Sequence, residues 1–138
     1  MKLLSKNETE TKDIGRRLGE KLGPGDIVCL YGELGAGKTT MVKGIASALG
    51  INERDITSAS FTIIAEYDAP VPFYHIDLYR LTPQEVVELG LRDYLGGGVS
   101  VIEWAEKAEG EIPPEHIRVE LNYLDGDMRE IEIEGIEI

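Results

Sequence analysis

Apolar residues recur at helical spacing in two stretches of the chain, residues 7–22 and 38–49, and each stretch predicts an amphipathic helix. The first opens on Asn7, a residue type that caps helices, and is expected to stop at Gly23-Pro24. Between the two stretches lies "DIVCLY", residues 26–31, a short apolar run typical of a buried strand. This part of the chain therefore predicts the order helix, strand, glycine-rich loop, helix.

The middle of the chain changes to a strand pattern. "FTIIAEY" and "FYHIDLY", residues 61–67 and 73–79, are rich in β-branched and aromatic residues. The prolines between them cannot continue a strand ladder, so the two runs predict a hairpin. A short helix is expected next, with Thr82 as its N-cap, Glu85 completing a capping box and Gly90 as its stop.

The last part of the chain again has strand patterns. "VSVIEW", residues 99–104, predicts a buried strand that closes on a carboxylate. Residues 116–123 and 128–138 alternate with period two around the turn "LDGD" and predict a second hairpin, in which Gly135 marks a bulge or a strand end. The whole pattern predicts one α/β domain over residues 1–138, with a mixed, mostly parallel central sheet and β-hairpins.

Composition and charge exclude several classes of protein. The formal net charge is −12, with 26 acidic against 14 basic residues, which is unsuited to broad contact with nucleic-acid phosphates. The acidity serves solubility or a docking surface for a basic partner. No segment approaches the ~18 apolar residues of a membrane helix, and the N-terminus lacks the apolar region of a signal peptide, so we expect a cytoplasmic protein without membrane contact. Cys29, the only cysteine, is expected to be a packed strand residue rather than a reactive thiol.

The stretch "GELGAGKT", residues 32–39, fits the phosphate-binding pattern G-x-x-x-x-G-K-[ST], and it stands after a predicted strand and before a predicted helix, as that pattern requires. Its backbone N–H groups are expected to surround phosphates, and the positive end of the helix adds to their field. The chain is therefore predicted to have a P-loop NTPase-like, three-layer fold. The residues expected to bind the nucleotide here are Gly32, Glu33, Leu34, Gly35, Ala36, Gly37, Lys38, Thr39 and Thr40.

A few side chains in and beyond this loop carry the expected chemistry. Lys38 is predicted to be a solvent-facing charge that acts catalytically on the outer phosphates, and Thr39 offers a hydroxyl to Mg²⁺. Asp77 and Glu103 each end a predicted strand, where a carboxylate holds the metal's water shell or orients the attacking water. Taken singly, either acid is also readable as a solvated strand-end residue, but the presence of two such acids favours a functional role for at least one of them.

Further features narrow the nucleotide and the reaction. The tetrad [NT]-K-x-D, which reads guanine in P-loop proteins, does not occur in the sequence, so ATP is expected rather than GTP. The arginines after the loop are scattered singly, which leaves no lid like that of small-molecule kinases. "DITSASFT", residues 55–62, is either a phosphate-sensing switch or a plain polar loop.

The motifs "GELGAGKTT", "TSASFT", "YHIDLYRL", "ELGLRDYL" and "VSVIEWAEK", in this order and in so short a chain, resemble the TsaE (YjeE) ATPases of bacterial tRNA threonylcarbamoyladenosine synthesis. The resemblance runs from about Lys2 to Leu121. One departure is visible, because the family's S-P-T-[FY] stands here as Ser58-Ala59-Ser60-Phe61. Loss of the proline is expected to loosen this loop, while Ser60 keeps a hydroxyl.

This resemblance implies ATP in the P-loop, Mg²⁺ held through Thr39 and Glu103, Asp77 essential for hydrolysis, and Trp104 beside the nucleotide. It also implies the TsaB and TsaD proteins as partners, with ATP hydrolysis resetting their complex between rounds of threonylcarbamoyl transfer. The tRNA would be reached only through that complex. The chain alone is expected to hydrolyse ATP slowly.

Other interpretations fit the same residues. A small-molecule kinase would move phosphate onto an acceptor instead of water, and a non-hydrolysing assembly factor would bind ATP and a partner without releasing phosphate. Trp104 is also readable as a core or partner-facing aromatic residue, and His75 as an ordinary strand histidine. Arg80 is readable as a phosphate-facing finger or as a salt-bridge partner.

Overall fold

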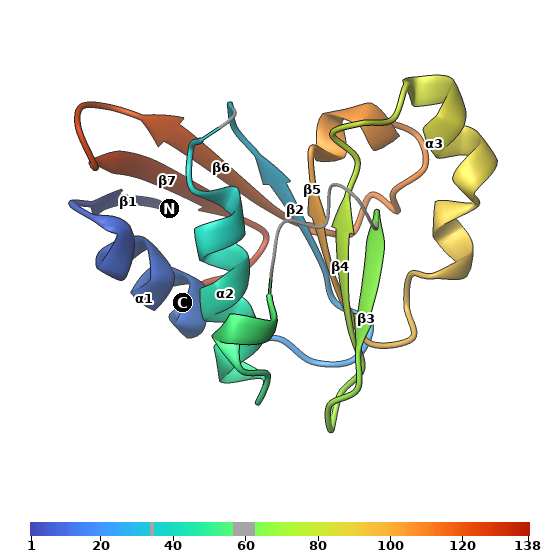
Figure 1. Ribbon diagram of the computed structural model, residues 1–138, viewed down its shortest axis with the longest axis horizontal. Coiled ribbons are helices and arrows are strands. Elements are labelled where there is room, and N and C mark those ends of the chain that lie inside the picture. The colour runs from blue at the N-terminus through green and yellow to red at the C-terminus, as the bar shows by residue number, and fades with distance from the viewer. Residues whose placement is uncertain (34, 57–62) are drawn as a thin grey trace.

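A mixed sheet forms the centre of the molecule (Figure 1). The computed structural model describes residues 1–33, 35–56 and 63–138, and within them the sheet has seven strands in the order β1-β7-β6-β2-β5-β4-β3. The strands are β1 (Lys2–Ser5), β2 (Ile27–Tyr31), β3 (Ile64–Tyr67), β4 (Phe73–Asp77), β5 (Val99–Glu103), β6 (Ile117–Tyr123) and β7 (Arg129–Glu134).

The direction of the strands confirms the mixed, mostly parallel sheet. The central strands β6, β2, β5 and β4 are parallel neighbours, and β1 runs in the same direction. Only β7 and β3, among the strands of the described residues, run the other way. Both predicted hairpins are present, as β3–β4 and β6–β7. Because parallel strands share their carboxyl ends, residues that end β2, β4 and β5 meet at one edge of the sheet.

In the described ranges, the helices are α1 (Glu8–Gly19), α2 (Lys38–Ala48) and α3 (Pro83–Leu89), with 3-10 turns η1 (Glu53–Asp55), η2 (Leu91–Asp93) and η3 (Ala105–Ala108). Asn7 caps α1 as predicted, because its side chain accepts the Glu10 N–H at 2.9 Å. Thr82 forms the predicted capping box at α3. The α1 helix ends at Gly19, before the expected stop at Gly23. None of these helices is long and apolar enough to cross a membrane.

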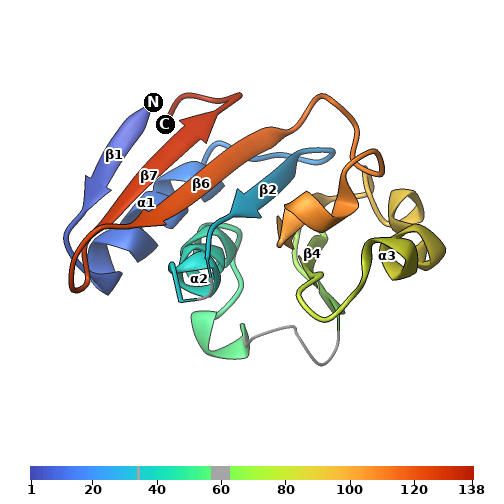
Figure 2. The same cartoon turned by 90° about the horizontal axis from the view of Figure 1, so that it is seen from above.

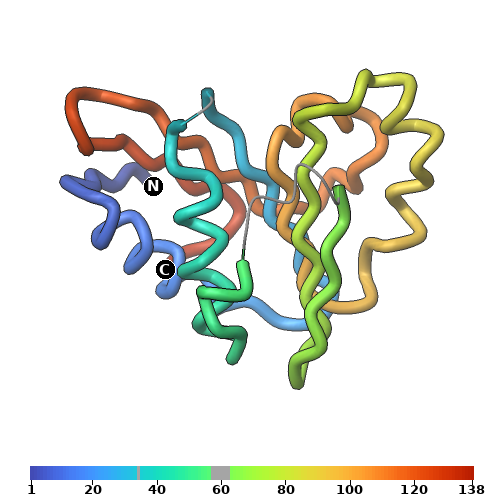
Figure 3. Tube along the Cα trace, in the orientation of Figure 1, coloured from blue at the N-terminus to red at the C-terminus, as the bar shows by residue number. Residues whose placement is uncertain are grey.

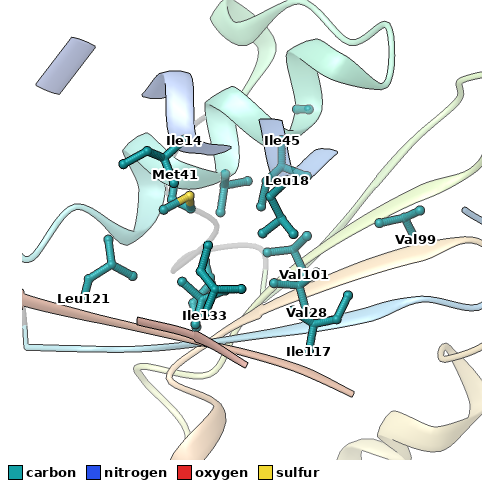
Figure 4. Packing of buried hydrophobic residues seen from close by; sticks show 14 of the residues in the cluster. Ile14, Leu18, Val28, Met41, Ile45, Val99, Val101, Ile117, Leu121 and Ile133 are labelled. Atoms are coloured by element: carbon teal, nitrogen blue, oxygen red, sulfur yellow. The ribbon is translucent and has the colours of Figure 1, made fainter. Parts of the chain in front are cut away.

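The helices pack on both faces of the sheet and give the predicted three layers (Figure 2). The larger apolar core lies between the sheet and the pair α1 and α2 (Figure 4), and its residues include Ile14, Leu18, Val28, Met41, Ile45, Val101 and Ile133. Cys29 belongs to the smaller core on the α3 side, where burial raises the pKa of its thiol to about 12. This thiol is therefore a packed group, as the sequence predicts.

Helices α1 and α2 approach each other closely at Gly44 of α2. A Cβ atom at this position would lie 2.1 Å from the carbonyl oxygen of Lys12 and 2.9 Å from the backbone nitrogen of Arg16, both on α1. Only glycine fits here, because the backbone of α1 occupies the space of a side chain. The contact holds α2, and the loop that precedes it, against α1.

The sequence pattern does not predict β1. This strand forms by antiparallel pairing with β7, in which Leu3 lies opposite Ile131. The N-terminal amine also donates to the Ile133 carbonyl at 3.0 Å, so the chain start lies beside the C-terminal hairpin (Figure 3). Two leucines in four residues give too weak a local pattern, and the pairing partner is more than a hundred residues away.

Candidate nucleotide site

The loop predicted to bind phosphate, residues 32–40, connects the end of β2 to the first turn of α2. Gly37 caps α2 from the left-handed region, with φ of 103°, a conformation that residues with side chains rarely adopt. The first N–H groups and the dipole of this 11-residue helix favour an anion at its start. Leu34 lies outside the described residues.

Lys38 turns its ammonium group back onto the loop. Its Nζ donates to the carbonyls of Gly32 at 2.5 Å and Glu33 at 2.8 Å, and it lies 4.1 Å from the centre of the Trp104 ring. The prediction of a solvent-facing charge is therefore wrong, because Lys38 is only 5% exposed. Burial lowers the pKa of Lys38, and the nearby Glu103 carboxylate opposes that shift. The ammonium is held at the mouth of the loop, and phosphate oxygens are stronger acceptors for it than carbonyls.

Two acids and a hydroxyl meet at the carboxyl edge of the sheet. Asp77 ends β4 and Glu103 ends β5, and the two are direct partners in the parallel register. The Thr39 hydroxyl, in the first turn of α2, lies 3.3 Å from each carboxylate oxygen of Glu103. The structure thus brings together the two residues that the sequence assigns to Mg²⁺, with the second acid beside them.

Asp77 is buried, with 4% of its surface exposed. Burial raises the pKa of its carboxyl group, while the Tyr79 N–H, which donates to Oδ1 at 3.0 Å, lowers it. Glu103 adds a smaller upward contribution as a neighbouring negative charge, and Lys38 a downward one. A carboxylate in this environment is a better proton acceptor than one in water.

His75 also belongs to the site, although the sequence alone favours an ordinary strand residue. It is fully buried on β4, and its Nε2 lies 2.5 Å from Oε2 of Glu103. His75 and Asp77 are two residues apart on one strand, so they face the same side of the sheet. That spacing is a signal in the sequence, but the contact with Glu103 depends on the β4–β5 register.

Arg129, at the start of β7, braces the loop from the C-terminal hairpin. Its Nε donates to the Ala36 carbonyl at 3.1 Å, and its Nη2 to the Gly35 carbonyl at 3.2 Å. Nη1 donates to Gly126 and Met128 within the hairpin. Nothing in the local sequence indicates this residue, because it contacts a loop more than ninety positions away.

Trp104 follows Glu103 and is half-buried in the left-handed region, with φ of 59°. Its ring lies against Lys38 on one side and 5.0 Å from the Tyr79 ring on another. Together with Gly32 and Glu33 it lines a cavity of about 830 Å³. A non-glycine residue at positive φ is held by its surroundings, and such strain gathers at functional sites.

The remaining predicted residues divide into three groups. Thr40, Gly35 and Gly37 line a second, polar cavity of about 240 Å³ that Arg129 also borders. The switch-like segment around Ser58-Ala59-Ser60 lies outside the described residues, so its role stays a prediction. Arg80 is exposed just beyond β4, and its role also stays a prediction.

These side chains suit a nucleotide with Mg²⁺. The oxygen donors of Thr39 and Glu103 are the hard ligands that Mg²⁺ prefers, and a helix start with a lysine suits phosphates. In the described residues no group of three or more His, Cys, Asp and Glu side chains forms a metal centre. Mg²⁺ commonly completes its coordination with waters and substrate phosphates, so two protein oxygens fit it.

Comparisons with known proteins show what this chain is similar to. A family model described as "Threonylcarbamoyl adenosine biosynthesis protein TsaE" matches residues 5–131. Proteins named tRNA threonylcarbamoyladenosine biosynthesis protein TsaE are similar to this chain: that of Nostoc sp. strain PCC 7120 is 43% identical, covering 96% of this chain and 84% of its own. That of Bacillus subtilis strain 168 is 44% identical, covering 91% and 79%. The crystal structure of Bacillus subtilis YdiB superposes with a TM-score of 0.79 at 41% identity, over 95% of this chain and 82% of that one.

Proposed function

Because the chain belongs to the TsaE family, we propose that it is the ATP-binding and ATP-hydrolysing component of tRNA threonylcarbamoyladenosine synthesis. In this proposal it acts on a complex of TsaB and TsaD and resets that complex between turnovers. The tRNA would be held by the partners, since this chain carries a formal net charge of −12. A role in tRNA modification is consistent with the cytoplasmic location that the sequence predicts for this chain.

One observation carries the ATPase proposal: the Thr39 hydroxyl lies 3.3 Å from both oxygens of Glu103, directly beside the N-terminus of α2. A hydroxyl and a carboxylate at the end of a phosphate-binding loop are the protein ligands that P-loop NTPases use for Mg²⁺. When bound, Mg²⁺ would neutralise charge that develops on the phosphate oxygens.

Each side chain of the site has its own role in this proposal. Lys38 would give up its two carbonyl acceptors for phosphate oxygens, and Thr39 and Glu103 would hold the metal. Asp77 would orient the attacking water and accept its proton, because its raised pKa makes it a better base than an exposed carboxylate. Trp104 would cover Lys38 and the nucleotide beside it.

The two acids provide the test. We expect Glu103→Gln to weaken the Mg²⁺ dependence of ATP binding, since the amide replaces a metal ligand. We expect Asp77→Asn to keep Mg²⁺-dependent binding but to lose hydrolysis by about 10²–10⁴-fold, the usual contribution of a positioned base. Both are measured by titration with ATP at several Mg²⁺ concentrations, alongside phosphate release in the presence of TsaB and TsaD.

The outcomes separate the roles and the alternatives. Loss of Mg²⁺-dependent binding in Asp77→Asn, with retention in Glu103→Gln, would exchange the two assignments. Normal hydrolysis by both variants would refute the mechanism. Transfer of the phosphate to an acceptor would make the protein a kinase, and ATP binding without phosphate release in any mixture would make it an assembly factor.

A further inference from the structure

We infer that His75 is a positioning residue for the metal site, which fixes the Glu103 carboxylate toward Thr39 by donating a hydrogen bond to it. The inference rests on the proposed function, because it concerns the Mg²⁺ that would accompany ATP. In this inference His75 does not touch the metal itself but holds Glu103, one of the two residues that would bind the metal.

The contact between His75 and Glu103 is short and shielded from water. The distance from Nε2 to Oε2 is 2.5 Å, and the side chains are 0% and 4% exposed. An ionised carboxylate only accepts hydrogen bonds, so Nε2 must carry the proton in this pair. His75 stands two residues before Asp77, and Asp77 is the register partner of Glu103. All three side chains therefore lie on the face of the sheet that packs against α2.

Glu103 depends on this bond for its orientation. Among the described residues the other hydrogen-bond partner of its carboxylate is Thr39, whose hydroxyl lies 3.3 Å from both carboxylate oxygens. A separation of 3.3 Å is long for a hydroxyl donor, and its equal division between two oxygens does not select one rotation of the carboxylate. The short bond to Oε2 does select a rotation, and in that rotation Oε1, which lies 3.3 Å from the Thr39 hydroxyl, would face the metal.

A packing role alone does not explain a histidine here. The other ring nitrogen, Nδ1, is buried, and within the described residues it has no hydrogen-bond partner. A buried polar atom without a partner is destabilising, so an apolar side chain of similar volume would fill this position at lower cost. The Nε2–Glu103 bond is the interaction that an apolar residue cannot supply. Residues that orient metal ligands in this way typically change metal affinity or activity about 10–100-fold when they are replaced.

The test compares His75→Leu, which removes the donor, with His75→Gln, whose amide N–H reaches the position of Nε2. Calorimetric titration with ATP is repeated over a range of Mg²⁺ concentrations. We expect His75→Leu to raise the Mg²⁺ concentration for half-maximal binding by about 10–100-fold, and His75→Gln to recover most of that loss. ATP affinity without Mg²⁺ should stay at the parent value, because Lys38 and the loop are unchanged.

Ser100→Ala is the matched control. Ser100 is fully buried on β5 next to β4, and its hydroxyl also has no hydrogen-bond partner within the described residues, but it faces away from α2. This variant should keep the parent's Mg²⁺ dependence, and melting temperatures are recorded for every variant. If His75→Leu does not fold, His75→Asn takes its place, because its shorter amide cannot reach Glu103.

The possible results distinguish the inference from the proposal beneath it. If the parent binds ATP with Mg²⁺ dependence and no His75 variant changes that dependence, the inference fails and the proposed function stands. If the Leu and Gln variants lose ATP binding equally with and without Mg²⁺, His75 is structural and the inference also fails. If the parent itself shows no Mg²⁺-dependent ATP binding, the proposed function fails and the inference with it.

Discussion

Arg129 provides the most quantitative prediction, because it is a single side chain that braces the P-loop without standing in the phosphate position. Its guanidinium donates to the carbonyls of Gly35 and Ala36 and is anchored in the hairpin by two more carbonyls. The group also lies 4.7 Å from the centre of the Tyr123 ring. Arg129→Met removes the charged fork and keeps a similar length of aliphatic chain, so the loop loses its brace.

The size of the effect follows from the two bonds to the loop. A hydrogen bond from a charged donor contributes about 1.5–3 kcal/mol when it is shielded from water. Arg129 is only half-buried, so solvent screening reduces both bonds, and together they contribute about 1–2 kcal/mol to holding the loop in one shape. If the loop must be ordered when ATP binds, the binding free energy is weakened by the same amount, about 1–2 kcal/mol. The dissociation constant for ATP then rises by about 5–30-fold.

The assay is ATP affinity by calorimetry, with Arg16→Met as the matched control. Arg16 is an exposed residue of α1 and lines neither cavity of the candidate site. Its salt bridge to Asp13, at 2.8 Å, joins side chains that are 53% and 48% exposed, and such surface pairs contribute little. The control should therefore bind ATP within about twofold of the parent, which is the range expected for a surface change.

Equal ATP affinity in Arg129→Met and the parent would mean that the loop keeps its shape without Arg129, and the proposed role of this residue would be wrong. An equal loss in both arginine variants would also refute it, since the effect would then come from the charge of the protein rather than from the contact with the loop.

Other predictions concern the lysine, the base preference, the buried acid and the helix packing. Lys38→Met should weaken ATP binding by about 10–150-fold, as loss of a charged hydrogen bond predicts, and calorimetry on the folded variant checks it. ATP should compete for the site better than GTP, and equal potency of the two in a competition assay would contradict the assignment. Burial raises the pKa of Asp77, so the folded parent loses stability as the pH rises from the ordinary pKa of 3.8 through the raised pKa of the folded state. Asp77→Asn should therefore have a higher melting temperature than the parent at neutral pH. The difference in melting temperature between the two proteins should vanish at acidic pH. Gly44→Ala should cost about 3 kcal/mol or more in unfolding free energy because its Cβ meets the α1 backbone at 2.1 Å, whereas Gly23→Ala, which meets nothing within 4 Å, should cost much less.

The sequence pattern was sufficient to predict those helices and strands whose signals lie within their own residues. The α3 helix carries its own start and stop signals, and the strand before the P-loop is a continuous apolar run, so both can be predicted without knowledge of the fold. The β1 strand cannot, because its stability comes from pairing with β7 at the other end of the chain. The capping signals of α1 similarly indicate where it begins better than where it ends.

The residues of the candidate site also divide into those that the local sequence predicts and those that depend on long-range contacts. The P-loop is contiguous, and Asp77 and Glu103 are marked by their position at strand ends, so their meeting at one edge is predictable. His75 shares a face with Asp77 by strand period, but its bond to Glu103 needs the strand register. Arg129 reaches the loop only through the β6–β7 hairpin. Lys38 is buried because Trp104 folds over it, which no spacing in the sequence indicates.

We propose that this chain hydrolyses ATP to act on partner proteins, and phosphate release by the purified chain, measured alone and mixed with TsaB and TsaD, tests this proposal. The structure offers Lys38 for the phosphates, and the arginines after the loop are scattered singly along the sequence instead of forming a lid. We therefore expect the partners to supply stabilising charge or ordering, so release should be slow for the chain alone and rise when the partners are added. Lys38→Met should release no phosphate in either mixture. Rapid release by the chain alone that the partners leave unchanged, or no release in any mixture, would show that the chain is not a partner-stimulated ATPase.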